Sequence, residues 1–119
     1  MSDLHVLQWG GAFTGSSTLP TFGLYLTTRS SGTGEWTTFE DVFGKTGYPT
    51  DSQGKWIQLG NYTCAVDSEK GDLHVCAVDT HGAVWHTIRK SSGTWSKWGN
   101  ATKAAHFHQL LWGGVAVAS

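Results

Sequence analysis

Apolar residues along the chain come in short runs that alternate with polar residues, and Gly, Asp, Ser and Asn interrupt these runs at regular intervals. The runs are rich in Val, Thr, Ile and aromatic residues, which is typical of half-buried β-strands. No window shows the sustained spacing of an amphipathic helix. The pattern predicts an all-β protein, with strands at 3–9, 22–29 and 35–39 and then at 56–66, 72–79, 83–90 and 94–99.

The chain contains an internal repeat. Asp3-Leu-His-Val recurs as Asp72-Leu-His-Val, at an offset of 69 residues. The motif Thr-x-Arg-x-Ser occurs at 27–31 and again at 87–91, and the aromatic pair Trp36 and Phe39 matches Trp95 and Trp98. A truncated third copy at 108–114 resembles 5–11. Because the order is kept while the offset falls from 69 to 60 to 59, the copies differ by insertions in turns, which a repeated sheet tolerates.

One strand is missing from the first copy, and one segment is left over at the end of the chain. The first copy has no counterpart of the strand at 56–66, and the segment 105–117 has no sheet of its own. This arrangement predicts strand exchange, in which the C-terminal segment of one subunit completes the first sheet of the next.

The stretch DLHVCAVDTHGAVWHTIRKSSGTWSKWG at 72–99, with DVFGKTGYP at 41–49, resembles the blade repeat of tectonin-like β-propeller lectins, particularly the Photorhabdus-type lectins. The match is close over 72–100, looser over 3–48, where Leu26 replaces a histidine, and weak over 105–114. The resemblance implies four-stranded antiparallel propeller blades and sugar sites near the blades or in the clefts between them. It also implies fucose or O-methylated sugars as ligands.

Family members carry six or seven blades, whereas this chain holds about two: blade 1 over 3–48 and blade 2 over 54–101, within a single domain 1–119. Two blades cannot close a ring, and their open edges and apolar faces must be covered in a soluble protein. We therefore expect a homo-oligomer, a trimer with six blades or a tetramer with eight, whose ring is closed by strand exchange.

Charge and composition limit the classes of partner that this protein can be expected to bind. The formal net charge of −1 gives no basic patch for nucleic acid. No apolar run approaches the ~20 residues of a membrane span, and the N-terminus lacks the features of a signal peptide. We expect a protein that is cytoplasmic, or released without a signal peptide, and whose partners are uncharged glycans.

Candidate site residues come from the aromatic and arginine positions that the repeat duplicates. Alternation places Trp85, Thr87 and Arg89 on one face of a strand, and the first copy repeats this face with Tyr25 and Arg29. An aromatic ring can stack on a sugar and a guanidinium can donate to its hydroxyls. The same residues could instead be core between blades. The full set of candidates is Tyr25, Arg29, Trp36, Trp85, Arg89, Trp95, Trp9 and Trp112.

The remaining aromatic, cysteine and histidine residues are expected to be structural. Trp98, Phe39 and Trp56 are assigned to the core. Cys64 and Cys76 fall on neighbouring strands and face each other or not depending on a one-residue register, with the reduced pair expected in a cytosolic protein. The pair His106 and His108 lacks nearby acidic or cysteine partners, so no metal site is expected.

No nucleophile, phosphate-binding or metalloprotease motif occurs, and no cofactor is expected. Two functions remain: a non-catalytic lectin that is multivalent through its ring, or a structural or protein-interaction propeller fragment that binds no sugar.

Overall fold

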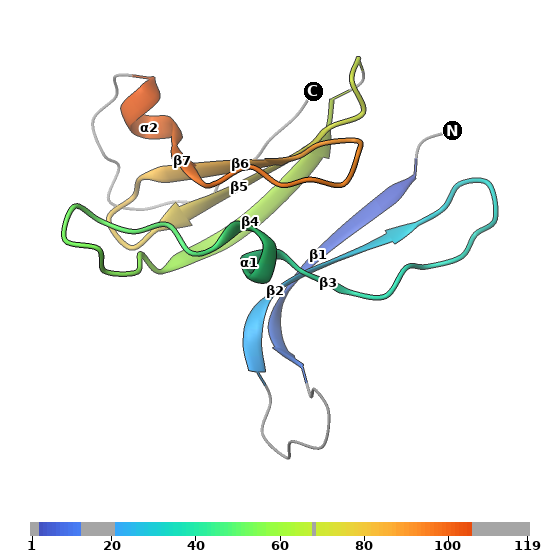
Figure 1. Ribbon diagram of the computed structural model, residues 1–119, viewed down its shortest axis with the longest axis horizontal. Helices are drawn as coiled ribbons and strands as arrows, with labels where there is room; N and C mark the ends of the chain where they lie inside the picture. Colours follow the sequence, from blue (N-terminus) through green and yellow to red (C-terminus); the bar gives the residue numbers. More distant parts are fainter. Residues whose placement is uncertain (1–2, 13–20, 68, 106–119) are drawn as a thin grey trace. The chain divides into compact units, whose positions relative to one another are not determined.

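The computed structural model describes residues 3–12, 21–67 and 69–105, and it confirms the prediction of an all-β protein built from short antiparallel strands. The chain divides into two compact units, Met1–Lys45 and Thr46–Ser119. Each unit carries one sheet (Figure 1). No helix in the described part of the chain is long and apolar enough to cross a membrane.

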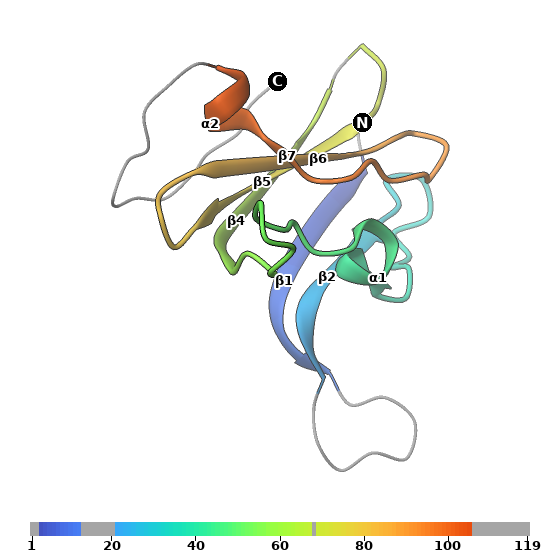
Figure 2. The ribbon, with the colours of Figure 1, turned by 60° about the vertical axis from the view of Figure 1, so that its left-hand side comes forward.

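The first unit is a three-stranded sheet in the order β1–β2–β3. β1 (Leu4–Ala12) pairs with β2 (Thr21–Arg29) along their whole length, and Figure 2 shows this pair as two long, curved ribbons. β3 (Glu40–Asp41) pairs with the middle of β2. The short helix α1 (Val42–Thr46) follows directly.

The second unit is a four-stranded sheet in the order β4–β5–β6–β7. Its strands are β4 (Leu59–Val66), β5 (Leu73–Asp79), β6 (Val84–Arg89) and β7 (Gly99–Asn100). The one-turn helix α2 (Ala101–Ala104) follows β7, as α1 follows β3. In the described residues, therefore, the second sheet has one strand, β4, that the first sheet lacks, as the repeat predicts.

The internal repeat is present in the hydrogen bonds as well as in the sequence. The Ser31 N–H donates to Asp3 Oδ1 at 2.8 Å, and the Ser91 N–H donates to Asp72 Oδ1 at 2.9 Å. The hydroxyl of Thr27 donates to the carbonyl of Thr37 at 2.7 Å, and that of Thr87 donates to Ser96 at 2.7 Å. The two sheets are thus copies of one unit, at the offsets of 69, 60 and 59 residues read from the sequence.

Helix starts are duplicated too. Asp41 Oδ1 accepts the Gly44 N–H at 3.0 Å, and Asn100 Oδ1 accepts the Lys103 N–H at 2.8 Å. A side-chain oxygen at this position satisfies a donor that the first helical turn leaves unpaired. Helices of five and four residues are too short to produce a helical periodicity, which is why the hydrophobic pattern did not predict them.

Alternation along β5 separates a buried face from a half-exposed one. Leu73, Val75 and Ala77 are buried, whereas His74 and Cys76 are half-buried. His5 and its repeat partner His74 are both hydrogen-bonded within their sheets, His5 Nδ1 to the Thr28 hydroxyl at 3.0 Å and His74 Nδ1 to His86 Nε2 at 2.9 Å. This confirms the structural role expected for the two histidines.

The strand register settles the question of the two cysteines. Cys64 pairs with Val75, and Cys76 pairs with Thr63. Directly paired residues point to the same face, so the two thiols lie on opposite faces of the sheet and cannot form a disulfide without a change of register. Both are free thiols, and burial raises the pKa of each.

Two core assignments are wrong. Trp56 is 75% exposed and Phe39 is 54% exposed, whereas Trp98 is buried as expected and donates its indole N–H to the Thr46 hydroxyl at 2.9 Å. Trp56 does not open an inner strand: it is bridged to Thr50 in a hairpin that precedes β4.

The outer strands predicted at 35–39 and 94–99 are not continuous. Each consists of a single bridge, at Trp36 or Trp95, that precedes the two-residue strand β3 or β7.

Candidate functional site

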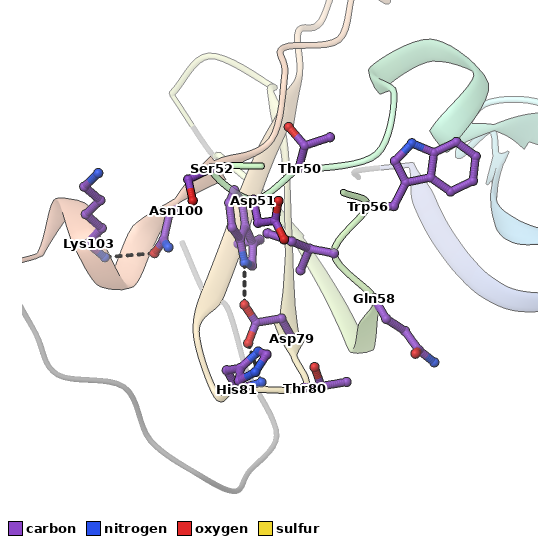
Figure 3. Close-up of a pocket in the computed structure, with 12 residues that line it drawn as sticks. Thr50, Asp51, Ser52, Trp56, Gln58, Asp79, Thr80, His81, Asn100 and Lys103 are labelled. Atoms are coloured by element: carbon purple, nitrogen blue, oxygen red, sulfur yellow. Dashed lines mark hydrogen bonds between the residues drawn. The ribbon is translucent and has the colours of Figure 1, made fainter. Parts of the chain in front are cut away.

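A pocket of about 590 Å³ opens at one end of the second sheet (Figure 3). The turn before Trp56, the turn between β5 and β6, and the start of α2 form its walls. Its lining residues are Thr50, Asp51, Ser52, Trp56, Ile57, Gln58, Asp79, Thr80, His81, Trp85, Asn100 and Lys103. Pockets of about 300–1,000 Å³ hold small-molecule ligands, so this one is large enough for a ligand of that class.

Two turns of the same construction face this pocket. In the turn Asp51–Lys55, Asp51 Oδ1 accepts the N–H groups of Gln53 at 2.8 Å and Lys55 at 2.9 Å. The Gly54 N–H donates to the Asp51 carbonyl at 3.0 Å, and the glycine has a φ of 78°, which a side chain would strain. The carboxylate of an Asp thus fixes the backbone of its own turn.

The turn Asp79–Ala83 repeats this scheme. Asp79 Oδ1 accepts the N–H groups of His81 at 2.8 Å and Ala83 at 2.9 Å, and Gly82 has a φ of 83°. The second carboxylate oxygen of Asp79 accepts the indole N–H of Trp85 at 2.9 Å. Because this bond fixes the orientation of the indole, Trp85 is held in place in the wall of the pocket.

Several polar atoms around the pocket have no hydrogen-bond partner in the described part of the chain. Asp51 uses Oδ1 in its turn, which leaves Oδ2 as an acceptor. Asn100 uses Oδ1 to cap α2, which leaves its amide NH₂ as a donor. The Lys103 ammonium is a further donor, and the hydroxyls of Ser52 and Thr80 can donate or accept. Fixed donors and acceptors beside two indoles suit a ligand with both hydroxyl groups and an apolar face.

Of the seven residues proposed from the sequence that the structure describes, only Trp85 lines this pocket. Arg89 is paired with Leu73 at the other end of β6, and four residues of strand separate it from Trp85 by about 13 Å. Arg89 is bridged to Trp95. The aromatic and the arginine of this strand share a face, as expected, but one sugar ring cannot contact both.

The corresponding residues of the first unit form a separate group. Arg29 is bridged to Trp36, and its guanidinium lies over Gly34, where an added Cβ would come within 3.0 Å of it. Tyr25 meets Phe39 edge to face, with ring centroids 6.5 Å apart. Trp9 is half-exposed and lies on the opposite face of the sheet from Tyr25, since Tyr25 pairs with Gln8. Trp112, the remaining candidate, lies outside the described residues, as do the segment 106–117 and His106 and His108.

The candidates proposed from the sequence did not include Asp51, Asp79, Asn100 or Lys103. A signal for two of these was present: the pattern Asp-x-x-Gly-x occurs at 51–55 and at 79–83, an offset of 28 that a search for whole blades passes over. Among the residues that the structure places, no group of three His, Cys, Asp or Glu side chains could hold a metal.

Comparisons with known proteins add no assignment. No protein-family model, no curated protein and no solved structure matches this chain.

Proposed function

We propose that the chain is a non-catalytic, carbohydrate-binding lectin whose sugar site is the pocket of the second unit. The observation that carries the proposal is the combination of an oriented indole, Trp85, with the unpaired acceptor of Asp51 and the unpaired amide of Asn100. A sugar presents a C–H face that packs against an aromatic ring and hydroxyls that need fixed donors and acceptors. The resemblance of the repeat to propeller lectins supports the same reading.

Neutral sugars fit this pocket best. Two carboxylates, Asp51 and Asp79, line it against a single lysine, so an anionic sugar would meet an excess of like charge. A neutral ligand such as fucose or an O-methylated sugar, which the resemblance implies, brings no such repulsion.

The first unit does not repeat the key residues of this pocket. At the offsets of the repeat, Gly10 stands for Asp79, Tyr25 for Trp85 and Gly44 for Lys103. The first unit therefore lacks the Asp turn and the ammonium group. Chains that each carry this site would gain avidity for clustered glycans by assembling into an oligomer.

We further propose that the two sheets are propeller blades and that three or four chains close a ring of six or eight blades by strand exchange. The strand β1 has one neighbour, β2, in the described residues, whereas its counterpart β5 has two. Leu4 is 55% exposed, whereas its counterpart Leu73 is 2% exposed. The mass of the protein in solution, measured by light scattering, should be three or four times that of the 12.9 kDa chain; a monomer would overturn the ring.

The sugar site is tested by a glycan array with the wild-type protein and with Asp51→Asn. This substitution keeps Oδ1 for the turn and turns the free acceptor into a donor, so binding should fall while the fold is kept. Asp67→Asn is the matched control, because Asp67 Oδ1 accepts two backbone N–H groups in a turn that does not line the pocket. Absence of binding to any glycan by the wild-type protein would favour the alternative function, a structural or protein-interaction propeller fragment.

A further inference from the structure

Trp56 is the most exposed of the large hydrophobic residues in the described chain, at 75%, and it lies on the rim of the pocket. One face of its indole is nevertheless covered by another ring. One ring face stacks on Tyr48, with centroids 4.7 Å apart and planes 14° apart, and its backbone is bridged to Thr50. An aromatic ring that is fixed on one side and exposed on the other is a surface on which a flat apolar group can stack.

Trp56 is also close to the polar part of the pocket. Residues directly opposite each other in an antiparallel bridge have Cα atoms about 5 Å apart, so Trp56 lies beside Thr50 and next to Asp51. Figure 3 shows Trp56 on the opposite side of Asp51 from Asn100 and Lys103. The indole of Trp56 therefore lies beside the polar side chains of Asp51, Asn100 and Lys103 but is separate from them.

We propose that Trp56 forms a second subsite and that the natural ligand is a neutral oligosaccharide of at least two sugar residues. One residue binds beside Trp85, where Asp51 and Asn100 contact its hydroxyls, and the adjoining residue stacks on Trp56. The proposal rests on the carbohydrate-binding function proposed above and adds the length of the ligand to it.

The pocket has room for more than a single sugar. Its volume of about 590 Å³ lies in the middle of the range of small-molecule pockets, so a disaccharide can enter it as well as a monosaccharide. Stacking on Trp56 also adds affinity at a small entropic penalty, because Tyr48 already restricts the indole before the ligand binds.

The experiment compares Trp56→Ala with the wild-type protein by titration calorimetry, using methyl α-L-fucoside and the strongest oligosaccharide from the array. We expect Trp56→Ala to lower the affinity for the oligosaccharide about tenfold, which is the effect of one aromatic contact, and to leave the affinity for the monosaccharide unchanged. Trp56→Phe keeps a ring and should retain most of the affinity. The matched control is Trp36→Ala, since Trp36 is 51% exposed in the first unit and does not line the pocket.

Each other result has a definite meaning. If Trp56→Ala lowers the affinity for the monosaccharide and for the oligosaccharide equally, or lowers neither affinity, there is no second subsite although the lectin function stands. If Trp36→Ala has the same effect, or if Trp56→Ala changes the mass of the protein in solution, Trp56 acts through assembly and the inference is wrong. If no glycan binds the wild-type protein, the function itself is wrong and this inference falls with it.

Discussion

Asp72 and Asp3 make the same hydrogen bond in the two copies of the repeat, but in different surroundings. Asp72 is 6% exposed and accepts the Ser91 N–H at 2.9 Å, while its other oxygen is 3.6 Å from the Lys90 ammonium. Asp3 is exposed and accepts the Ser31 N–H at 2.8 Å, a bond that holds its pKa below the ordinary value. Removing each carboxylate separates the effect of burial from the effect of the bond.

We expect Asp72→Ala to lower the free energy of unfolding by about 2–3 kcal/mol. A hydrogen bond to a charged group contributes about 1.5–3 kcal/mol, and its loss leaves the Ser91 N–H without an acceptor. The ion pair adds less than about 1 kcal/mol, because Lys90 is half-exposed and water screens it. Asp72→Asn keeps an acceptor for Ser91 and should lose less. Asp3→Ala should lower stability by less than Asp72→Ala does, because Asp3 is exposed and water can replace its carboxylate as the acceptor of the Ser31 N–H.

Urea denaturation followed by tryptophan fluorescence measures these differences from the shift in the midpoint at constant slope. Far-ultraviolet circular dichroism of the variants verifies that each one folds. Equal destabilisation by Asp3→Ala and Asp72→Ala would show that burial has no part in the effect, contrary to this prediction.

Three further outcomes are expected. Gly54→Ala should lower stability by about 1 kcal/mol, measured in the same titration, because φ is 78° while nothing lies within 4 Å of an added Cβ. Burial lowers the pKa of His86, and the neighbouring His74 lowers it further. The unfolded chain therefore binds a proton at this position more readily than the folded protein does. The free energy of unfolding should be at its full value above pH 6.5 and should fall as the pH drops through the folded-state pKa of His86. His86→Leu, with the residue that the first repeat has at this position, should flatten that dependence in urea titrations at a series of pH values. Cys64 and Cys76 should both react slowly with a thiol reagent and remain unlinked under mild oxidation, as intact mass would show; a disulfide would mean that the register is wrong.

The sheets and their duplication could be predicted from the sequence because they rest on local patterns. The alternation of apolar and polar residues predicts the ends of β5 and β6 to within one residue of the observed ends. The paired motifs around Asp3 and Asp72 identify a repeat whose hydrogen bonds the structure duplicates. Such signals lie within a few residues of each other in each copy, and a β-strand keeps them in a fixed register.

The exposed aromatics could not be predicted in this way. Phe39 and Trp98 occupy matching positions, yet only Trp98 is buried, where it is hydrogen-bonded to Thr46. Trp56 lies in an irregular hairpin, in which alternation carries no information about faces. Which aromatic is covered depends on residues distant in the chain, and a single sequence does not display those contacts.

The candidate pocket was out of reach for the same reason. It gathers residues from 50–58, 79–85 and 100–103. The pattern Asp-x-x-Gly-x is shared by the first two segments, but no local motif connects them to 100–103. Only Trp85 was proposed, because the repeat made it visible. Duplication points to residues that both copies share, whereas this pocket depends on residues that one copy has and the other lacks.

If the pocket binds a sugar, as we propose, the paired turns at Asp51 and Asp79 determine how it discriminates between sugars. Each turn is fixed by its own carboxylate and by a glycine with positive φ, so neither wall can move to suit a ligand without breaking backbone hydrogen bonds. A rigid wall cannot follow a hydroxyl that changes from axial to equatorial. An epimer of the correct sugar would bury the free oxygen of Asp51 without a partner, and selectivity among stereoisomers would then arise from that penalty rather than from additional contacts to the preferred one.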